Sequence, residues 1–327
     1  MNFNFPSFIT ASYKKLENID YENPQNNVIN INNVDYIFKP LSEKGNKGGN
    51  SIILKLYENI SFDNKEDYSL LDDKKPNSIL KITNKYFEKG RGKSSFGYTH
   101  KRFLNEIQAL KICKESQNVI EIYLDGECII NGKNYLFYTM EYADDDLKGY
   151  IEKEHSNLPF ENKLKFCIEI LNGINDLYSN ELFHRDIKPD NIFIVEGKWK
   201  IADLGLVAGG RNLNYNFNEI SEFIGPRGWI SPEVMNKYLT ENKNFKRKYD
   251  CTIDIQSDIF QLGKLFWYIF QHNAPIGAIK MNDFENEFSI VYPILKTMLN
   301  HDKKRRYKNI EEIIPLFKKI EKRLLFN

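Results

Sequence analysis

The sequence has little of what marks a secreted or membrane-embedded protein. It contains only four cysteines in 327 residues, far apart and with no C-x-x-C pair: Cys113, Cys128, Cys167 and Cys251. This spacing favours free thiols in a reducing compartment over a metal site or a disulfide framework. The N-terminus lacks a basic region followed by an apolar core, so we expect no signal peptide. The most apolar helix candidate, Ile259–Phe270, is too short to span a bilayer, and we expect a cytoplasmic protein without a membrane span.

The charge balance lacks the basic excess of a nucleic-acid-binding protein. There are 46 Lys and Arg side chains against 45 Asp and Glu, which leaves a formal net charge of +1. Dedicated nucleic-acid binders usually carry a marked positive charge, so no nucleic-acid partner is expected. What the chain does have is 41% hydrophobic and 14% aromatic residues, enough for a sizeable core. Its length suits two domains or one bilobal domain.

The predicted elements divide the chain into a strand-rich part and a helical part. Residues 1–33 are polar and irregular, and we interpret them as an N-terminal arm. Residues 34–140 carry strand patterns, whereas residues 141–327 carry mostly helical patterns. The expected strands and helices include Ile52–Leu56, Ser78–Ile82, Tyr135–Tyr142, Pro232–Tyr238, Asp258–Phe270, Phe288–Leu299 and Ile310–Leu325. This order predicts an α+β fold with a small strand-rich N-lobe and a larger helical C-lobe.

The chemically most informative segment is His184–Asn191. Within eight residues it places the carboxylate of Asp186, the ammonium of Lys188 and the carboxamide of Asn191. The next residues predict a hairpin, made of Ile192–Val195, a Glu196-Gly197 turn and Lys198–Ile201. Asp203 follows this hairpin. Phosphoryl transfer needs groups of this kind in this order: a base, a charge clamp and two metal ligands.

The segment His184–Asn191 and the Asp203 region after the hairpin together resemble the catalytic segment of eukaryotic-type protein kinases of the Ser/Thr class. The resemblance covers about residues 34–325. It implies that Asp186 is the base that accepts the proton of the substrate hydroxyl. Lys188 matches the lysine that steadies the transferred phosphate. Asn191 and Asp203 match the two Mg²⁺ ligands, so the implied cofactors are ATP and Mg²⁺.

Upstream residues match the positions at which the family binds the nucleotide. Lys81 lies where the family has the lysine that holds the α- and β-phosphates, and Glu106 matches its acidic partner on the following helix. The resemblance also implies a hinge that contacts adenine, a floor under the adenine and a glycine-rich loop over the phosphates. These positions are Glu141 and Ala143 in the hinge, Phe193 as the floor, and Gly48 and Gly49 in the loop.

Further matches concern the architecture of the helical part. Ser231-Pro232-Glu233 resembles the end of the activation segment. Asp258 matches the aspartate that braces the backbone of the catalytic loop, and Arg306 matches the arginine that pairs with Glu233. A buried pair of this kind is a positional lock, because removal of one partner leaves the other charge unpaired.

The chain also departs from the family pattern. The glycine-rich loop is degenerate, and Pro226 stands where Ser/Thr kinases usually have a threonine beside the catalytic groups. The activation segment contains no threonine, and its usual phosphorylated position falls on Glu222, next to Ser221. We hypothesise that Glu222, or phosphorylated Ser221, presents negative charge to Arg185.

These observations predict a protein serine/threonine kinase that transfers the γ-phosphate of ATP to hydroxyls of a protein substrate. Two alternatives stay open: a pseudokinase scaffold that regulates a partner, and a small-molecule kinase with the same fold. The presence of all the matched charged residues disfavours the scaffold, and the Pro-Glu and Asp258 elements disfavour the small-molecule kinase.

Overall fold

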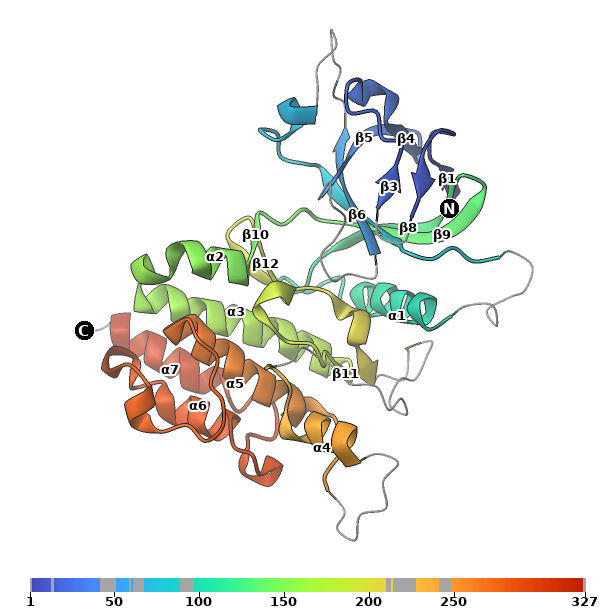
Figure 1. The fold of residues 1–327 in the computed structure, drawn as a ribbon. Helices are drawn as coiled ribbons and strands as arrows, with labels where there is room; N and C mark the ends of the chain where they lie inside the picture. The colour runs from blue at the N-terminus through green and yellow to red at the C-terminus, as the bar shows by residue number, and fades with distance from the viewer. Residues whose placement is uncertain are drawn as a thin grey trace. The chain divides into compact units, whose positions relative to one another are not determined.

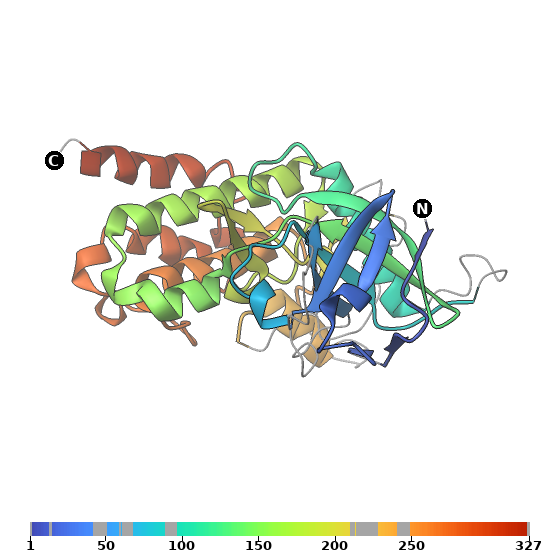
Figure 2. The same ribbon diagram turned by 90° about the horizontal axis from the view of Figure 1, so that it is seen from above.

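The chain forms two compact units in a computed structural model. The structure describes residues 2–12, 15–41, 51–58, 60, 68–88, 97–209, 213, 228–240 and 249–325. The first unit comprises Met1–Ile107 and Glu121–Tyr142, and the second comprises Gln108–Ile120 and Ala143–Asn327. The first is rich in strands and the second in helices (Figures 1 and 2), which confirms the predicted α+β bilobal fold.

A sheet with the strand order β1-β8-β9-β7-β6-β5-β4 forms the first unit. Its strands are β1 (Asn2–Asn4), β4 (Val28–Ile31), β5 (Val34–Pro40), β6 (Ser51–Glu58), β7 (Ser78–Thr83), β8 (Ile122–Ile130) and β9 (Lys133–Met140). All neighbours are antiparallel except β1 and β8. The remaining elements here are β2 (Thr10–Ala11), β3 (Leu16–Glu17), the short 3-10 helices Pro24–Asn26 and Tyr68–Leu71, and helix α1 (Tyr98–Ile112), which continues into the second unit.

Tight turns with positive φ connect one hairpin in each of the two units. Asn131 and Gly132, at φ 47° and 71°, join β8 to β9. This is the Asn-Gly sequence that two-residue hairpin turns favour, because both central residues need a left-handed backbone. Glu196 and Gly197, at φ 50° and 77°, join the hairpin of the second unit, at the turn predicted from the sequence.

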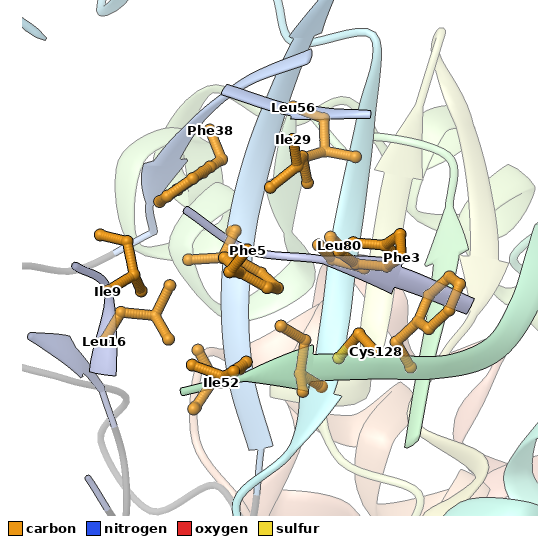
Figure 3. Close-up of a cluster of buried hydrophobic side chains, with 14 of the residues drawn as sticks. Phe3, Phe5, Ile9, Leu16, Ile29, Phe38, Ile52, Leu56, Leu80 and Cys128 are labelled. Carbon is orange, nitrogen blue, oxygen red and sulfur yellow. The ribbon is translucent and has the colours of Figure 1, made fainter. Parts of the chain in front are cut away.

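The first 33 residues add both strands and apolar side chains to the first unit (Figure 3). Strand β1 pairs with β8, so Phe3 lies opposite Cys128. The ring of Phe3 packs edge-on against that of Phe137, with 4.6 Å between the ring centres. The rings of Phe5 and Phe38 pack with 5.3 Å between their centres. Full burial of one such side chain contributes about 1.5–3 kcal/mol. Residues 1–33, whose polar sequence predicts an arm, therefore cover apolar surface of the sheet.

Helices dominate the second unit. They are α2 (Leu147–Glu154), α3 (Phe160–Ser179), α4 (Pro232–Thr240), α5 (Ile255–Gln271), α6 (Tyr292–Met298) and α7 (Ile314–Leu325). Strands β10 (Asp145–Asp146), β12 (Ile192–Val195) and β13 (Lys198–Ile201) form one small sheet, and β11 (Leu182–Phe183) pairs with β14 (Ala208–Gly209). The short 3-10 helices are His155–Asn157, Pro189–Asn191, Leu204–Leu206, Met281–Asp283, Asn286–Phe288 and Lys303–Arg305.

Helix α5 lies at the centre of the second unit, and all but two of its 17 residues are buried. A helix that is apolar almost all round belongs in a core. Its start is defined by Asp254, whose side chain accepts a hydrogen bond from the Gln256 amide at 2.9 Å. Its end is defined by His272, which takes the left-handed conformation at φ 54°. Among the described helices, including this one, none is long and apolar enough to cross a membrane.

Helix α3 packs closely on the strand that leads to Asp203. A side-chain carbon at Gly173 would lie 2.3 Å from the carbonyl oxygen of Asn118, which is too close for any other residue. That carbonyl accepts a hydrogen bond from the Ile201 amide at 2.8 Å, at the end of β13. The absence of a side chain at Gly173 therefore lets α3 approach the backbone on which Asp203 is mounted.

Candidate active site

The segment His184–Asn191 forms a loop between β11 and β12, and its charged groups converge on Asp186. The Lys188 ammonium donates to Oδ2 of Asp186 at 3.1 Å. The Asn191 amide nitrogen donates to the same oxygen at 2.9 Å and to the Asp186 carbonyl oxygen at 2.8 Å. The structure thus brings together three of the residues that the sequence singles out.

The surroundings of Asp186 raise the pKa of its carboxyl group. Burial raises the pKa of this carboxyl to about 6; Lys188 opposes the shift, and the charge of Asp203 adds to it. A base works best when its pKa lies near the working pH, because it is then ionised and still able to hold a proton. The loop therefore presents a carboxylate suited to general-base chemistry.

Helix α5 holds the backbone of this loop in place. The Asp258 carboxylate accepts from the amides of His184 at 2.8 Å and of Arg185 at 2.9 Å. Gln261, one turn later, accepts from the Ile187 amide at 3.2 Å and donates to the Arg185 carbonyl oxygen at 3.3 Å. Burial raises the pKa of Asp258, while the His184 charge and the two backbone donors oppose that shift. The predicted bracing contact of Asp258 is confirmed, and Gln261 is a support that the sequence did not reveal.

Asp203 follows β13 and starts the short helix Leu204–Leu206. Its φ of 53° lies in the left-handed region, which is uncommon for a residue with a side chain and recurs at functional sites. The preceding residue, Ala202, donates its amide to the Asn191 carbonyl oxygen at 2.9 Å and accepts from the His184 ring at 3.2 Å. These bonds tie the Asp203 backbone to the loop that carries Asp186.

In the first unit, Lys81 and Glu106 form a buried ion pair. The ammonium of Lys81 lies 2.7 Å from Oε1 of Glu106, and the Glu106 side chain is only 3% exposed. The pairing predicted from the sequence between β7 and α1 is thus confirmed. At this burial the pair is stable only if further hydrogen bonds satisfy its oxygens.

Tyr138 on β9 supplies that further bond. Its hydroxyl donates to the same Oε1 of Glu106 at 2.9 Å, and the Lys81 ammonium lies 5.6 Å from the centre of its ring. Lys81 and Tyr138 are direct partners across β7 and β9, so their side chains project from the same face of the sheet. Tyr138 is not among the residues predicted for the site; the signal in the sequence was a hydroxyl-bearing residue inside a strand predicted to be buried.

The remaining predicted nucleotide contacts are placed as follows. The Glu141 amide donates to the Glu121 carbonyl oxygen at 3.1 Å, and its carboxylate accepts from the Glu121 amide at 2.7 Å. Ala143 and Phe193 are half-buried, and Phe193 lies opposite Asp146 on β10. The glycine-loop residues Gly48 and Gly49, like Ser221, Glu222 and Pro226, lie outside the described residues.

A second buried ion pair joins α4 to Arg306, which follows the short helix Lys303–Arg305. Arg306 lies 2.7 Å from Glu233, with their side chains 0% and 2% exposed, as predicted. The guanidinium also donates to the carbonyl oxygens of Asn300 at 2.6 Å and Gln256 at 2.9 Å. These additional bonds allow the charged pair to be buried at an acceptable cost.

Residues 73–325 match the protein kinase domain family, so the chain belongs to that family. Among curated proteins, it is similar to the mouse dual specificity protein kinase TTK, with 24% identity over 69% of this chain and 25% of TTK. It is also similar to a probable serine/threonine-protein kinase of Dictyostelium discoideum, with 32% identity over 40% of this chain and 24% of that protein. The Candida albicans serine/threonine-protein kinase CLA4 is 30% identical over 47% of this chain and 14% of CLA4. The matched regions thus span a quarter or less of these relatives.

Proposed function

We propose that the chain is an active protein kinase that transfers the γ-phosphate of ATP to serine or threonine hydroxyls of protein substrates. The observation that carries this proposal is the convergence of Lys188 and Asn191 on Asp186, in a loop whose backbone is held by Asp258. The names of the curated relatives support the Ser/Thr assignment.

In this reaction Asp186 acts as the general base. The substrate oxygen forms a bond to the γ-phosphorus while the bond to the β–γ bridging oxygen breaks, and the hydroxyl proton passes to the Asp186 carboxylate. With a pKa of about 6, Asp186 is mostly ionised at neutral pH and can accept this proton. Lys188 keeps its ammonium 3.1 Å from that carboxylate, where a positive charge also stabilises the phosphoryl group in transfer.

The residues present fit a divalent cation bound together with the nucleotide. Both hydrogen bonds of the Asn191 side chain to Asp186 use its nitrogen, which leaves its carbonyl oxygen as the ligand atom. With the Asp203 carboxylate this makes two oxygen ligands, and Mg²⁺ typically takes one or two protein ligands together with phosphate oxygens. Among the described residues no cluster of three His, Cys, Asp or Glu could hold a metal alone. When bound, Mg²⁺ neutralises phosphate charge.

Lys81 is the proposed contact for the α- and β-phosphates. Its ammonium is fixed by Glu106 and stays 11% exposed at the side chain, so it can meet an anion without losing its partner. Because the Glu106 oxygen accepts from both Lys81 and Tyr138, the lysine is held in one position before the nucleotide binds.

The test is transfer of labelled phosphate from ATP, with Mg²⁺, to generic protein substrates. We expect Asp186→Asn to lower the rate by at least about 100-fold, the usual contribution of a general base. Asp190→Asn is the matched control, because Asp190 lies in the same loop with a half-exposed side chain. Equal labelling by wild type and Asp186→Asn would disprove the catalytic assignment and favour a scaffold. Phosphoamino-acid analysis of the product checks the Ser/Thr preference.

A further inference from the structure

A large apolar cavity lies in the second unit, and its described lining residues fall between Gly228 and His301. It has a volume of about 820 Å³ and lies next to α4 and α5, which pack side by side. Met235 and Tyr238 on α4 and Ile276 in the loop after α5 form apolar walls, and Ile276 is 92% exposed. Exposed apolar side chains gathered around a hollow are typical of a surface that binds a partner.

The cavity contains a buried cation without a matching anion. Lys264 on α5 lines it and is 9% exposed, and its ammonium donates to the Gly228 carbonyl oxygen at 2.5 Å. No Asp or Glu is among the described lining residues, and within the described chain Lys264 has no carboxylate partner. The buried carboxylates of the same two helices are already occupied, Glu233 by Arg306 and Asp258 by the catalytic loop. Burial lowers the pKa of Lys264, as expected for an ammonium that lacks compensation.

A second polar group of the same cavity is also unsatisfied. Ser231 is 1% exposed, lines the cavity, and has no hydrogen-bond partner for its hydroxyl within the described residues. Buried hydroxyls normally have a hydrogen-bond partner, so the Ser231 hydroxyl marks the wall of this cavity as incompletely bonded. His301 is a further lining residue with hydrogen-bonding capacity.

We propose that this cavity binds a carboxylate side chain of the protein substrate, received by the Lys264 ammonium, together with an adjacent apolar residue that packs against Met235, Tyr238 and Ile276. A carboxylate accepts a hydrogen bond from an ammonium, and such a charge-assisted bond is stronger than a neutral one. This inference rests on the proposed function, because it assigns the bound segment to the kinase substrate.

The test measures peptide binding without catalysis. Asp186→Asn protein is titrated with fluorescein-labelled peptides that contain one serine and a Leu-Glu pair at successive positions after it. Matched peptides carry Leu-Gln or Leu-phosphoserine, and fluorescence anisotropy reports the Kd. We expect one register in which Glu binds about tenfold more tightly than Gln, equivalent to about 1.4 kcal/mol.

Variants assign that preference to the cavity. Lys264→Met keeps a long apolar side chain and is expected to abolish the Glu preference, whereas Lys264→Arg retains it. Equal binding of Glu and Gln peptides in every register would overturn the proposal, and this comparison requires no variant of the cavity to fold. Preference for phosphoserine alone would overturn the choice of a carboxylate.

The two proposals can fail separately. If wild-type protein phosphorylates generic substrates but shows no Glu preference, the cavity assignment is wrong and the kinase assignment stands. If the Glu preference depends on Lys264 but no substrate is ever labelled, the cavity binds acidic peptides and the kinase assignment is wrong.

Discussion

The two units hold their functional charges in different ways. In the first, the described contacts that position the Lys81 ammonium come from the side chains of Glu106 and Tyr138. In the second, Asp186 lies in a loop whose backbone is bonded to Asp258 and Gln261 of a buried helix. A side-chain network can be weakened while the fold persists, whereas a backbone brace couples the site to the core. Loss of support should therefore cost stability in the second unit and mainly nucleotide affinity in the first.

The largest expected effect on stability comes from the buried pair of the second unit. Arg306→Ala leaves Glu233 buried and unpaired, so we expect the free energy of unfolding to fall by about 3–5 kcal/mol. Denaturant unfolding measures this. Arg305→Ala is the matched control: its side chain is 75% exposed, and its ion pair should contribute less than about 1 kcal/mol. Equal losses for the two variants would contradict the assigned role.

The backbone brace is tested by Asp258→Asn. The amide can accept only one of the two backbone hydrogen bonds, so one buried N–H loses its partner at a cost of about 1–3 kcal/mol. We expect lower stability together with a large loss of kcat, because the loop that carries Asp186 shifts. Asp250→Asn, half-exposed just before the same helix, is the control. A variant of wild-type stability and kcat would show that the brace is dispensable.

The environment of Asp186 predicts a pH dependence. Only the ionised carboxylate accepts the proton, and its pKa is raised to about 6. Activity should therefore be full above about pH 7 and fall about tenfold per unit as the pH drops below 6. The measurement is kcat/KM from pH 5 to 8. The residual activity of Asp186→Asn should lack this break; a break of the same size in the variant would assign it to another group.

The smallest effect is expected from the side-chain network of the first unit. Tyr138→Phe removes one hydrogen bond to Glu106, with a cost of about 1 kcal/mol. We expect the KM for ATP to rise about fivefold and kcat to change less. Tyr135→Phe, a buried tyrosine on the same strand, is the control. A larger loss of stability than with Arg306→Ala would reverse the comparison between the units.

Local features of the fold were predictable from the sequence. The hairpin Ile192–Val195 and Lys198–Ile201 was predicted with its observed bounds, because an apolar run before the Glu-Gly turn and alternating polar and apolar residues after it define the hairpin locally. Helix α5 was predicted over 258–270 and spans Ile255–Gln271, since its cap lies in polar residues just before the apolar run. The order of charged residues around Asp186 was predictable in the same way.

Long-range pairing was not predictable. Strand β1 has only three residues and is formed by bonding to β8, more than 100 residues later in the chain. No periodicity within residues 1–33 reveals that partner. The role of Tyr138 was not predictable for the same reason, because it arises from contact with Lys81 and Glu106 on two other elements.

The sequence by itself determined the family and the groups available for chemistry, because residue types at short spacing specify both the loop around Asp186 and the proposed metal ligands Asn191 and Asp203. The tertiary structure alone decided the acidity of Asp186, the support of Lys81 by Tyr138, and the cation of Lys264 in an apolar cavity. Each of these depends on burial and on partners from distant segments, and burial is a property of the packed chain.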